Sequence, residues 1–182
     1  LGEEHPEIAS VLGNLAYVLY AKGEKAEAIQ QMRQALDMRR RVLGNEHPAT
    51  AGTATGLGYW LIEDGGYEES ERLYLEIIAE RERMLGPDGL ELGNVWNSYS
   101  QLLDNMGELD RAVAAHKTFL GIYERNVDKP HASYAAGYNN FALLLRRQGD
   151  LDGALDYYRM SVDMQDQIGL PPRHPNRSFP LG

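Results

Sequence analysis

The sequence predicts an all-α protein built as a solenoid of helix-turn-helix units, and three observations support this fold class. The segment Leu-Gly-Glu-Glu-His-Pro at residues 1–6 returns as Leu-Gly-Asn-Glu-His-Pro at residues 43–48, and this offset of 42 residues continues down the chain. A glycine followed five residues later by a small residue recurs with the same period. Apolar residues recur at helical spacing, and no segment alternates as a strand does.

The period predicts four units at residues 1–42, 43–84, 85–126 and 127–168. Residues 169–182 would then form a linker and the start of a truncated fifth unit. We expect this tail to be extended, and either packed on the fourth unit or captured by a neighbouring molecule.

Each unit is predicted to hold two helices joined by a tight glycine turn. In the first unit, apolar residues three and four positions apart from Ile8 to Leu19, including Val11, Leu12 and Leu15, predict a helix over residues 8–22. Gly23 can adopt the left-handed conformation that ends a helix, and a second apolar stripe predicts a helix over residues 26–42. The same pattern predicts helices over residues 49–64, 67–85, 90–106, 109–126, 132–148 and 151–167.

Small residues occupy matching positions in every unit, which lets two helices of a pair approach closely. They are Ala16, Gly58, Ser100 and Ala142 on the first helices, and Ala28, Ser70, Ala112 and Ala154 on the second. This order of large and small residues resembles the tetratricopeptide repeat, and the 42-residue length with its Leu-Gly-x-x-His-Pro linker resembles the kinesin light chain type. The resemblance covers the whole chain and implies a right-handed α-α superhelix whose first helices line the concave surface.

Composition narrows the classes of partner. The chain has 182 residues, 43% of them hydrophobic, which is typical of an ordinary soluble globular protein. A net charge of −9 argues against binding to nucleic acid or to anionic membranes, where basic patches supply the affinity. No apolar run approaches the roughly 18 residues that span a bilayer, and a cytoplasmic location is the expectation. The absence of cysteine excludes disulfides and thiolate zinc sites.

No constellation of residues points to catalysis, a cofactor or a metal. His5 and His47 occupy the same linker position in successive units, a repeat width apart, so they are expected to be exposed linker residues rather than ligands of one ion. His116 stands where other units have Tyr74 and Tyr158 and is expected to pack in the core. Three consecutive arginines at residues 39–41 leave a phosphate site as a second choice.

The residues opposite the packing stripe of the first helices are expected to point into a concave groove. Side-chain amides can both donate to and accept from an extended peptide backbone, and tyrosines add flat contact area. The predicted peptide-binding residues are Asn14, Tyr17, Tyr59, Asn94, Asn97, Ser98, Gln101, Asn105, Asn140 and Arg147. Chaperone-binding members of the family clamp a carboxylate with basic residues on their first helices. The corresponding positions here hold Ser, Asn, Gly or Ala, so we expect no such clamp.

The first hypothesis is a noncatalytic interaction module that binds a peptide or a partner protein in this groove. The alternative is a regulatory or oligomerising repeat region of a larger signalling enzyme, such as a bacterial kinase or a nucleotide-switch ATPase. Self-association through the ends of the array is a further option. The groove glycines Gly52 and Gly56 either allow close approach of a ligand or merely weaken their helix, and the sequence favours neither.

Overall fold

The computed structural model describes residues 5–169, and within that range the chain forms eight α-helices and no strand. The chain divides into two compact units between Pro87 and Asp88, and each unit contains two helix pairs. The protein therefore has the all-α helical-repeat fold that the sequence predicts.

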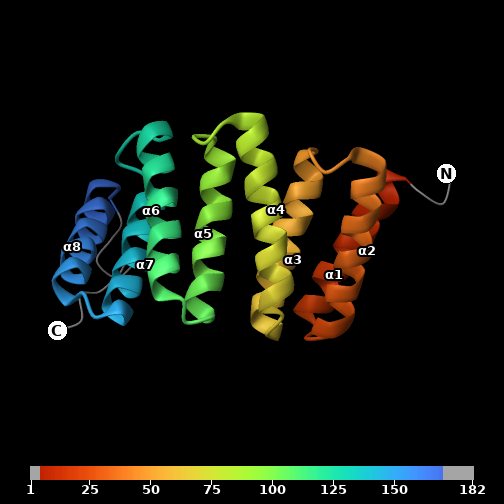
Figure 1. Cartoon of the computed structure of the whole chain (residues 1–182), viewed down its shortest axis with the longest axis horizontal. Helices are drawn as coiled ribbons and strands as arrows, with labels where there is room; N and C mark the ends of the chain where they lie inside the picture. Colours follow the sequence, from red (N-terminus) through yellow and green to blue (C-terminus); the bar gives the residue numbers. More distant parts are fainter. Residues whose placement is uncertain (1–4, 170–182) are drawn as a thin grey trace. The chain divides into compact units, whose positions relative to one another are not determined.

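The first unit contains α1 (Pro6–Ala21), α2 (Lys25–Leu43), α3 (Pro48–Asp64) and α4 (Tyr67–Leu85). The second contains α5 (Leu90–Asn105), α6 (Leu109–Asn126), α7 (Ala132–Gln148) and α8 (Leu151–Gln167). In both units each helix packs against the next one along the chain (Figure 1), as expected where stability comes from nearest-neighbour interfaces. All eight predicted helices are confirmed to within two residues at either end. The residues at which one repeat ends and the next begins, which lie in the linkers, remain a prediction.

Histidines cap three of the four first helices. The Nδ1 atoms of His5, His47 and His131 accept hydrogen bonds from the backbone N–H two residues later, at 3.2, 3.1 and 3.2 Å. Each bond satisfies one of the N–H groups that a helix start leaves unpaired. The predicted linker position is confirmed, although His5 is half-buried where we expected an exposed side chain, and the capping role was not anticipated.

Glycine turns end the first helices where the sequence places them. Gly23, Gly65, Gly107 and Gly149 have φ angles of 87°, 82°, 79° and 96°, a region that a side chain makes unfavourable. The chain can therefore reverse into the second helix of each pair without strain.

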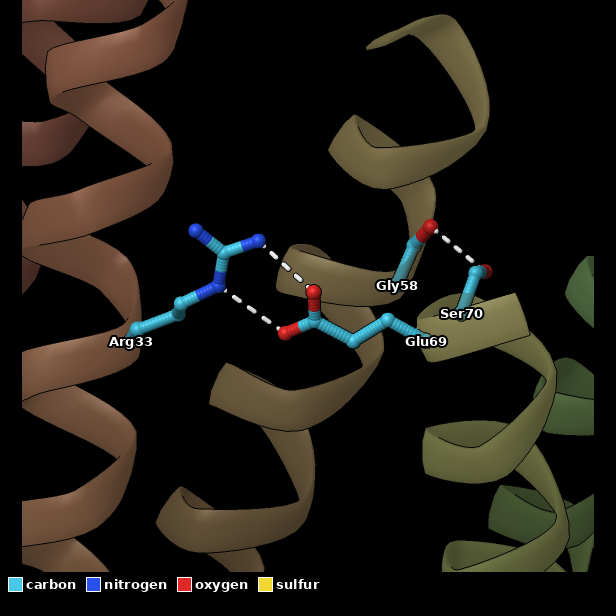
Figure 2. A network of polar contacts seen from close by, with 4 residues as sticks. All are labelled: Arg33, Gly58, Glu69 and Ser70. Carbon is cyan, nitrogen blue, oxygen red and sulfur yellow. Dashed lines mark hydrogen bonds and ion pairs between the residues drawn. The ribbon is translucent and has the colours of Figure 1, made fainter. Parts of the chain in front are cut away.

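The predicted small residues at the helix crossings are all buried, which confirms the packing rule inferred from the repeat. A Cβ atom on Gly58 would lie 2.9 Å from Cζ of the Tyr74 ring, so the packing of α3 against α4 leaves no room for a side chain here. The Ser70 hydroxyl donates to the carbonyl oxygen of Gly58 at 2.8 Å (Figure 2). The small residues thus bring the helices together and, at Ser70, also bond them.

One side of the apolar stripe on α1 is exposed, contrary to expectation. Val11 and Leu15 were placed in the packing stripe, but Val11 is 64% exposed and Leu15 43%. The position of Leu15 corresponds to Leu57 on α3 and Phe141 on α7, which are each 1% exposed. These residues face the preceding second helix, and no helix precedes α1 within residues 5–169. The expectation for the tail falls on residues 170–182, outside the described residues.

Candidate clefts on the first helices

The first unit has a cleft of about 190 Å³ between α1 and α3, with α2 beneath it. Asn14 and Tyr17, two of the predicted binding residues, lie in it, and Tyr17 is well exposed. Tyr59 is exposed on α3 but is not among the residues that line this cleft. The lining residues are Ser10, Gly13, Asn14, Tyr17, Met32, Arg39, Ala49, Gly52 and Thr53.

An aromatic cluster adjoins this cleft through Tyr17. The Tyr17 ring meets Trp60 edge-on with the ring centroids 5.1 Å apart, and Tyr20 stacks on Trp60 at 4.3 Å. The Tyr17 hydroxyl oxygen lies 3.5 Å from the position that a Cβ on Gly56 would occupy. Tyr17 thus packs against Trp60 on one side, while more than half of its side chain remains exposed and available to a ligand.

Glu63, which the repeat positions place on the groove side of α3, is already engaged. It accepts a hydrogen bond from the Tyr20 hydroxyl, and Lys25 Nζ lies 3.0 Å from its carboxylate. The Tyr20 bond, followed by the Lys25 bond, lowers the pKa of Glu63, so the carboxyl is ionised at neutral pH. Burial, and then the bond to Glu63, raises the pKa of Tyr20 to about 12. This charge serves the α1–α3 contact and is not free for a ligand.

The second unit has a cleft of about 200 Å³ between α5 and α7, with α6 beneath it. It brings together Gln101 and Asn140, which the sequence predicts as peptide-binding residues from different repeats. Asp104 and Leu143 lie on the same cleft. The complete lining is Ser100, Gln101, Asp104, His116, Asn140, Leu143 and Leu144.

His116 lies at the base of this cleft as a neutral packing residue, which confirms the prediction. It is 1% exposed, and its ring stacks on Phe141 with the centroids 5.3 Å apart. Nε2 donates to the carbonyl oxygen of Gly137 at 2.9 Å, so Nδ1 can accept from the Ser100 hydroxyl at 3.1 Å. Burial lowers the pKa of His116 to about 4, against the smaller opposing effect of the Gly137 bond.

The remaining predicted residues of the second unit mostly bond within the protein. Asn94 Oδ1 accepts from the Tyr123 hydroxyl at 2.8 Å, and the Ser98 hydroxyl donates to the Asn94 carbonyl at 3.2 Å. Asn105 donates to the Gln101 carbonyl at 2.8 Å, and Arg147 forms an ion pair with Asp104. These polar groups are used in bonds within the protein, so they contribute few free donors or acceptors to a ligand.

Asn97 differs from these residues because its Oδ1 atom is buried and has no hydrogen-bond partner within residues 5–169. A buried polar atom without a partner is destabilising until a water or a ligand satisfies it. Asn97 does not line the cleft that holds Gln101 and Asn140.

Within each unit, one contact joins the two first helices, and the residues at equivalent positions, 84 apart in the sequence, differ in chemistry between the units. The Asp104–Arg147 pair in the second unit occupies the positions of Tyr20 and Glu63 in the first. Leu144 stands at the position of Trp60, where the aromatic cluster of the first unit lies. The second unit accordingly has an open cleft where the first is filled by aromatic rings.

Sequence reasoning missed the contribution of the second helices to the clefts. Arg39 and Met32 on α2 line the first cleft, and His116 on α6 lines the second. A signal for Arg39 was present, because it interrupts the apolar stripe that runs through Ala35 and Leu36. Within residues 5–169, no group of three histidine, aspartate or glutamate side chains is arranged to hold a metal ion. No helix in the same range is long and apolar enough to cross a membrane.

Helix pairs that repeat every 42 residues, with small residues at each crossing, define a helical-repeat protein. Sequence profiles of the tetratricopeptide repeat match residues 8–49, 50–91 and 94–167, so the chain belongs to the tetratricopeptide repeat family. Its repeats are of the kinesin-light-chain-like type. Members of this family are typically noncatalytic scaffolds for protein–protein interaction.

Solved structures with this fold include BtubC (BKLC) from P. vanneervenii, with a TM-score of 0.83 and 19% identity over 100% of this chain and 72% of that one. A putative kinesin light chain with nearly identical TPR-like repeats from Podosopora anserina has a TM-score of 0.81 and 20% identity, covering 96% and 82% of the two chains. The apo form of RapI has a TM-score of 0.77 and 17% identity, covering 92% and 59%. No curated protein sequence matches the chain.

Proposed function

We propose that this interaction module binds an extended peptide segment of a partner protein in the clefts on its first helices. The observation that carries the proposal is the convergence of predicted polar residues at the two clefts. Gln101 and Asn140 line one, and Asn14 and Tyr17 line the other. The sequence picked out all four from repeat position alone.

The chemistry of these side chains suits a peptide backbone. An amide side chain offers two N–H donors and a carbonyl acceptor, so it can pair with a main-chain N–H and C=O whatever the peptide sequence. The ring of Tyr17, which packs edge-on against Trp60, adds apolar contact area with a hydroxyl at its edge. Apolar Leu143 beside Asn140 provides a surface for one side chain of the peptide.

Selection from a random peptide library, followed by fluorescence anisotropy with the selected peptides, tests this function. Asn140→Ala and Tyr17→Ala should each weaken binding by about tenfold, the equivalent of roughly 1.4 kcal/mol. Gln34→Ala is the matched control, because Gln34 is exposed on α2 and lines neither cleft. Affinities that stay unchanged in both cleft variants would remove the clefts from the binding surface.

The exposed face of α1 favours a second candidate, the oligomerising repeat region. Val11 and Val18 are 64% and 58% exposed, and with Leu15 they form one apolar stripe. The equivalent residues on α3 and α7 are buried, and these two helices pack against the second helix of the preceding repeat, α2 or α6. A second helix from another copy of the chain has the matching surface, and Leu155 on α8, 46% exposed, occupies the position of buried Ile29 on α2.

Sedimentation velocity across a range of concentrations tests this association. Leu15→Glu should shift the protein toward monomer, because a charge would be buried in the contact. Ala21→Glu, which adds the same charge at an exposed position of α1, should leave the distribution as it is in the unmodified chain. A wild-type protein that is monomeric at every concentration rules out the second candidate.

A further inference from the structure

We propose that Arg39 forms a subsite for a carboxylate of the bound peptide in the cleft between α1 and α3. This inference rests on the proposed function and names one chemical group that the ligand carries. Arg39 lies on α2 and lines the cleft from beneath. Its side chain is half-buried, so its charge is only partly exposed to water.

The contacts of Arg39 are all with uncharged oxygens. Nη1 donates to the carbonyl oxygen of Ala49 at 3.1 Å and to the hydroxyl of Thr53, and Nη2 donates to the hydroxyl of Ser10 at 3.3 Å. Arg39 makes no ion pair with a carboxylate within residues 5–169. The cleft therefore holds a full positive charge that the described part of the protein orients but does not neutralise.

The neighbouring arginines of α2 behave differently. Arg40 pairs with Glu76 on α4 at 2.7 Å, and Arg33 pairs with Glu69 on α4 at 2.6 Å. Arg39 and Arg40, two of the three arginines considered as a phosphate site in the sequence, thus point toward different neighbours. Of these arginines, Arg39 is the one that lines the cleft between the two first helices of the unit.

The guanidinium retains capacity for a ligand. Arginine has five N–H donors, and Arg39 commits three of them to the oxygens named above, which leaves two. The fork of a guanidinium matches the two oxygens of a carboxylate, and such charge-assisted hydrogen bonds are stronger than neutral ones. Partial burial strengthens the attraction further, because less water screens it.

In the second unit, the positions equivalent to Arg39 and Ser10 hold a neutral pair. Tyr123 and Asn94 occupy the positions of Arg39 and Ser10, and the Tyr123 hydroxyl donates to Asn94 Oδ1 at 2.8 Å. That pair is neutral and satisfied within the protein. The first unit places a charge at the same position instead, which marks this cleft as the one suited to an anionic group.

Space for the group lies beside the guanidinium. Gly13 and Gly52 line the cleft, and a Cβ atom on either would meet no atom within 4 Å. Asn14 and Tyr17 on the same lining offer an amide and a hydroxyl to the adjacent peptide backbone. This subsite differs from the carboxylate clamp of the chaperone-binding family members, which uses basic residues on first helices. Arg39 belongs to a second helix.

Nuclear magnetic resonance titration of the ¹⁵N-labelled protein tests the subsite with short peptides. The probe is acetyl-Ala-Gly-Glu-Gly-Ala-amide, and its control has Gln in place of Glu. A third peptide carries Gln and a free C-terminal carboxylate, which distinguishes a side-chain carboxylate from a chain terminus. We expect the amide signals of Gly13 and Gly52 to shift, with a Kd at least tenfold lower for one of the carboxylate peptides than for the neutral one.

Variants assign the effect to Arg39. Arg39→Gln keeps a hydrogen-bond donor but removes the charge, and should lose the tenfold preference while binding of the neutral peptide stays the same. Arg72→Gln removes one charge from an exposed position of α4 that does not line the cleft, and should keep the preference. If Arg39→Gln fails to fold, Gly52→Leu fills the cleft while leaving Arg39 in place, and should abolish the shifts.

Equal affinity for the three peptides overturns the subsite, as does a carboxylate preference that survives Arg39→Gln or Gly52→Leu. Shifts produced by inorganic phosphate but by neither carboxylate peptide also overturn it. These results are distinct from failure of the proposed function. Library-selected peptides that bind well, respond to Tyr17→Ala and ignore Arg39→Gln would leave the cleft as a peptide site and remove only the carboxylate.

Discussion

Two glycines of α3, Gly56 and Gly58, lie two positions apart and have opposite packing requirements. A Cβ on Gly56 would touch only the Tyr17 hydroxyl at 3.5 Å, which is an ordinary contact. A Cβ on Gly58 would press into the Tyr74 ring, which is completely buried. The repeat explains the second glycine by close helix packing, and nothing in the packing requires the first.

We predict that Gly56→Ala raises the free energy of unfolding by about 0.5–1 kcal/mol, because alanine restricts the unfolded chain and favours the helix. Gly58→Ala should lower it by about 1–3 kcal/mol through overpacking against Tyr74. Urea unfolding of the two variants side by side measures both changes. If Gly56→Ala is stabilising and also keeps peptide affinity, close ligand approach is not the reason for this glycine, which resolves the alternative that the sequence left open.

The buried histidine of the second unit predicts a loss of stability in mild acid. The folded pKa of His116 is about 4, below its ordinary value of 6.5. In the unfolded chain the ring takes up a proton as the pH falls through 6.5, whereas the folded protein resists protonation until about pH 4. The free energy of unfolding therefore has its full value above pH 6.5 and declines as the pH falls toward 4. The total loss from His116 is about 3 kcal/mol.

Urea midpoints between pH 7.5 and 4 measure this loss in the unmodified chain and in His116→Tyr. Tyrosine is the residue at the equivalent positions 74 and 158, and it does not titrate in this range. The difference between the two midpoints should change with pH. A constant difference would contradict the assigned protonation state.

Among the helices, contacts between second helices add ion pairs to the apolar interface. Arg33 on α2 binds Glu69 on α4 through two bonds, Nε to Oε1 at 2.9 Å and Nη2 to Oε2 at 2.6 Å (Figure 2). The bond from Arg33 lowers the pKa of Glu69, against the smaller effect of burial. Because the folded pKa is depressed, this contribution is present above the ordinary pKa of glutamate and is lost as the pH falls through the folded value.

We predict a coupling free energy of about 1 kcal/mol or less for this partly exposed pair, measured by a double-mutant cycle with Arg33→Gln and Glu69→Gln. The coupling should shrink in 1 M salt. Arg33→Lys should recover less than half of it, because lysine lacks the fork that reaches both oxygens. Full recovery by lysine would show that charge alone, and not geometry, sets the value.

The histidine caps at the starts of the first helices also contribute to stability. The Nδ1 atom of His47 caps α3, so His47→Ala should lower the free energy of unfolding by about 0.5–1 kcal/mol. His47→Asn, which can accept the same bond, should retain most of the stability. Thermal unfolding of the two variants compares them directly, and equal losses would show that the ring contributes through contacts other than the cap.

At the scale of the whole molecule, net charge should modulate the association that we propose through the apolar face of α1. The chain carries a net charge of −9 at pH 7 and an isoelectric point of about 5.0. Copies repel one another at neutral pH and lose that repulsion near pH 5. We predict that light scattering at 0.1 M salt shows stronger association at pH 5 than at pH 7, and that Leu15→Glu suppresses the increase. An increase of the same size in Leu15→Glu would assign the effect to general loss of charge.

The sequence by itself determined the helices, their glycine turns and the small residues at the crossings. These features follow from local rules: the 3.6-residue period, the left-handed conformation that glycine permits, and a packing position that recurs every 42 residues. It also placed Asn14, Tyr17, Gln101 and Asn140 on the surface of first helices, where the structure has two clefts.

Only the tertiary structure decided which polar groups are engaged within the fold and which face a cleft. Asn94 is bonded by Tyr123, 29 residues away, and Arg147 is paired with Asp104, whereas Arg39 contacts only uncharged oxygens across three helices. The repeat gives equivalent residues the same position, but the partner at that position comes from another helix and differs between units. A period can therefore predict where a side chain lies, while its charge balance depends on neighbours that the period does not specify.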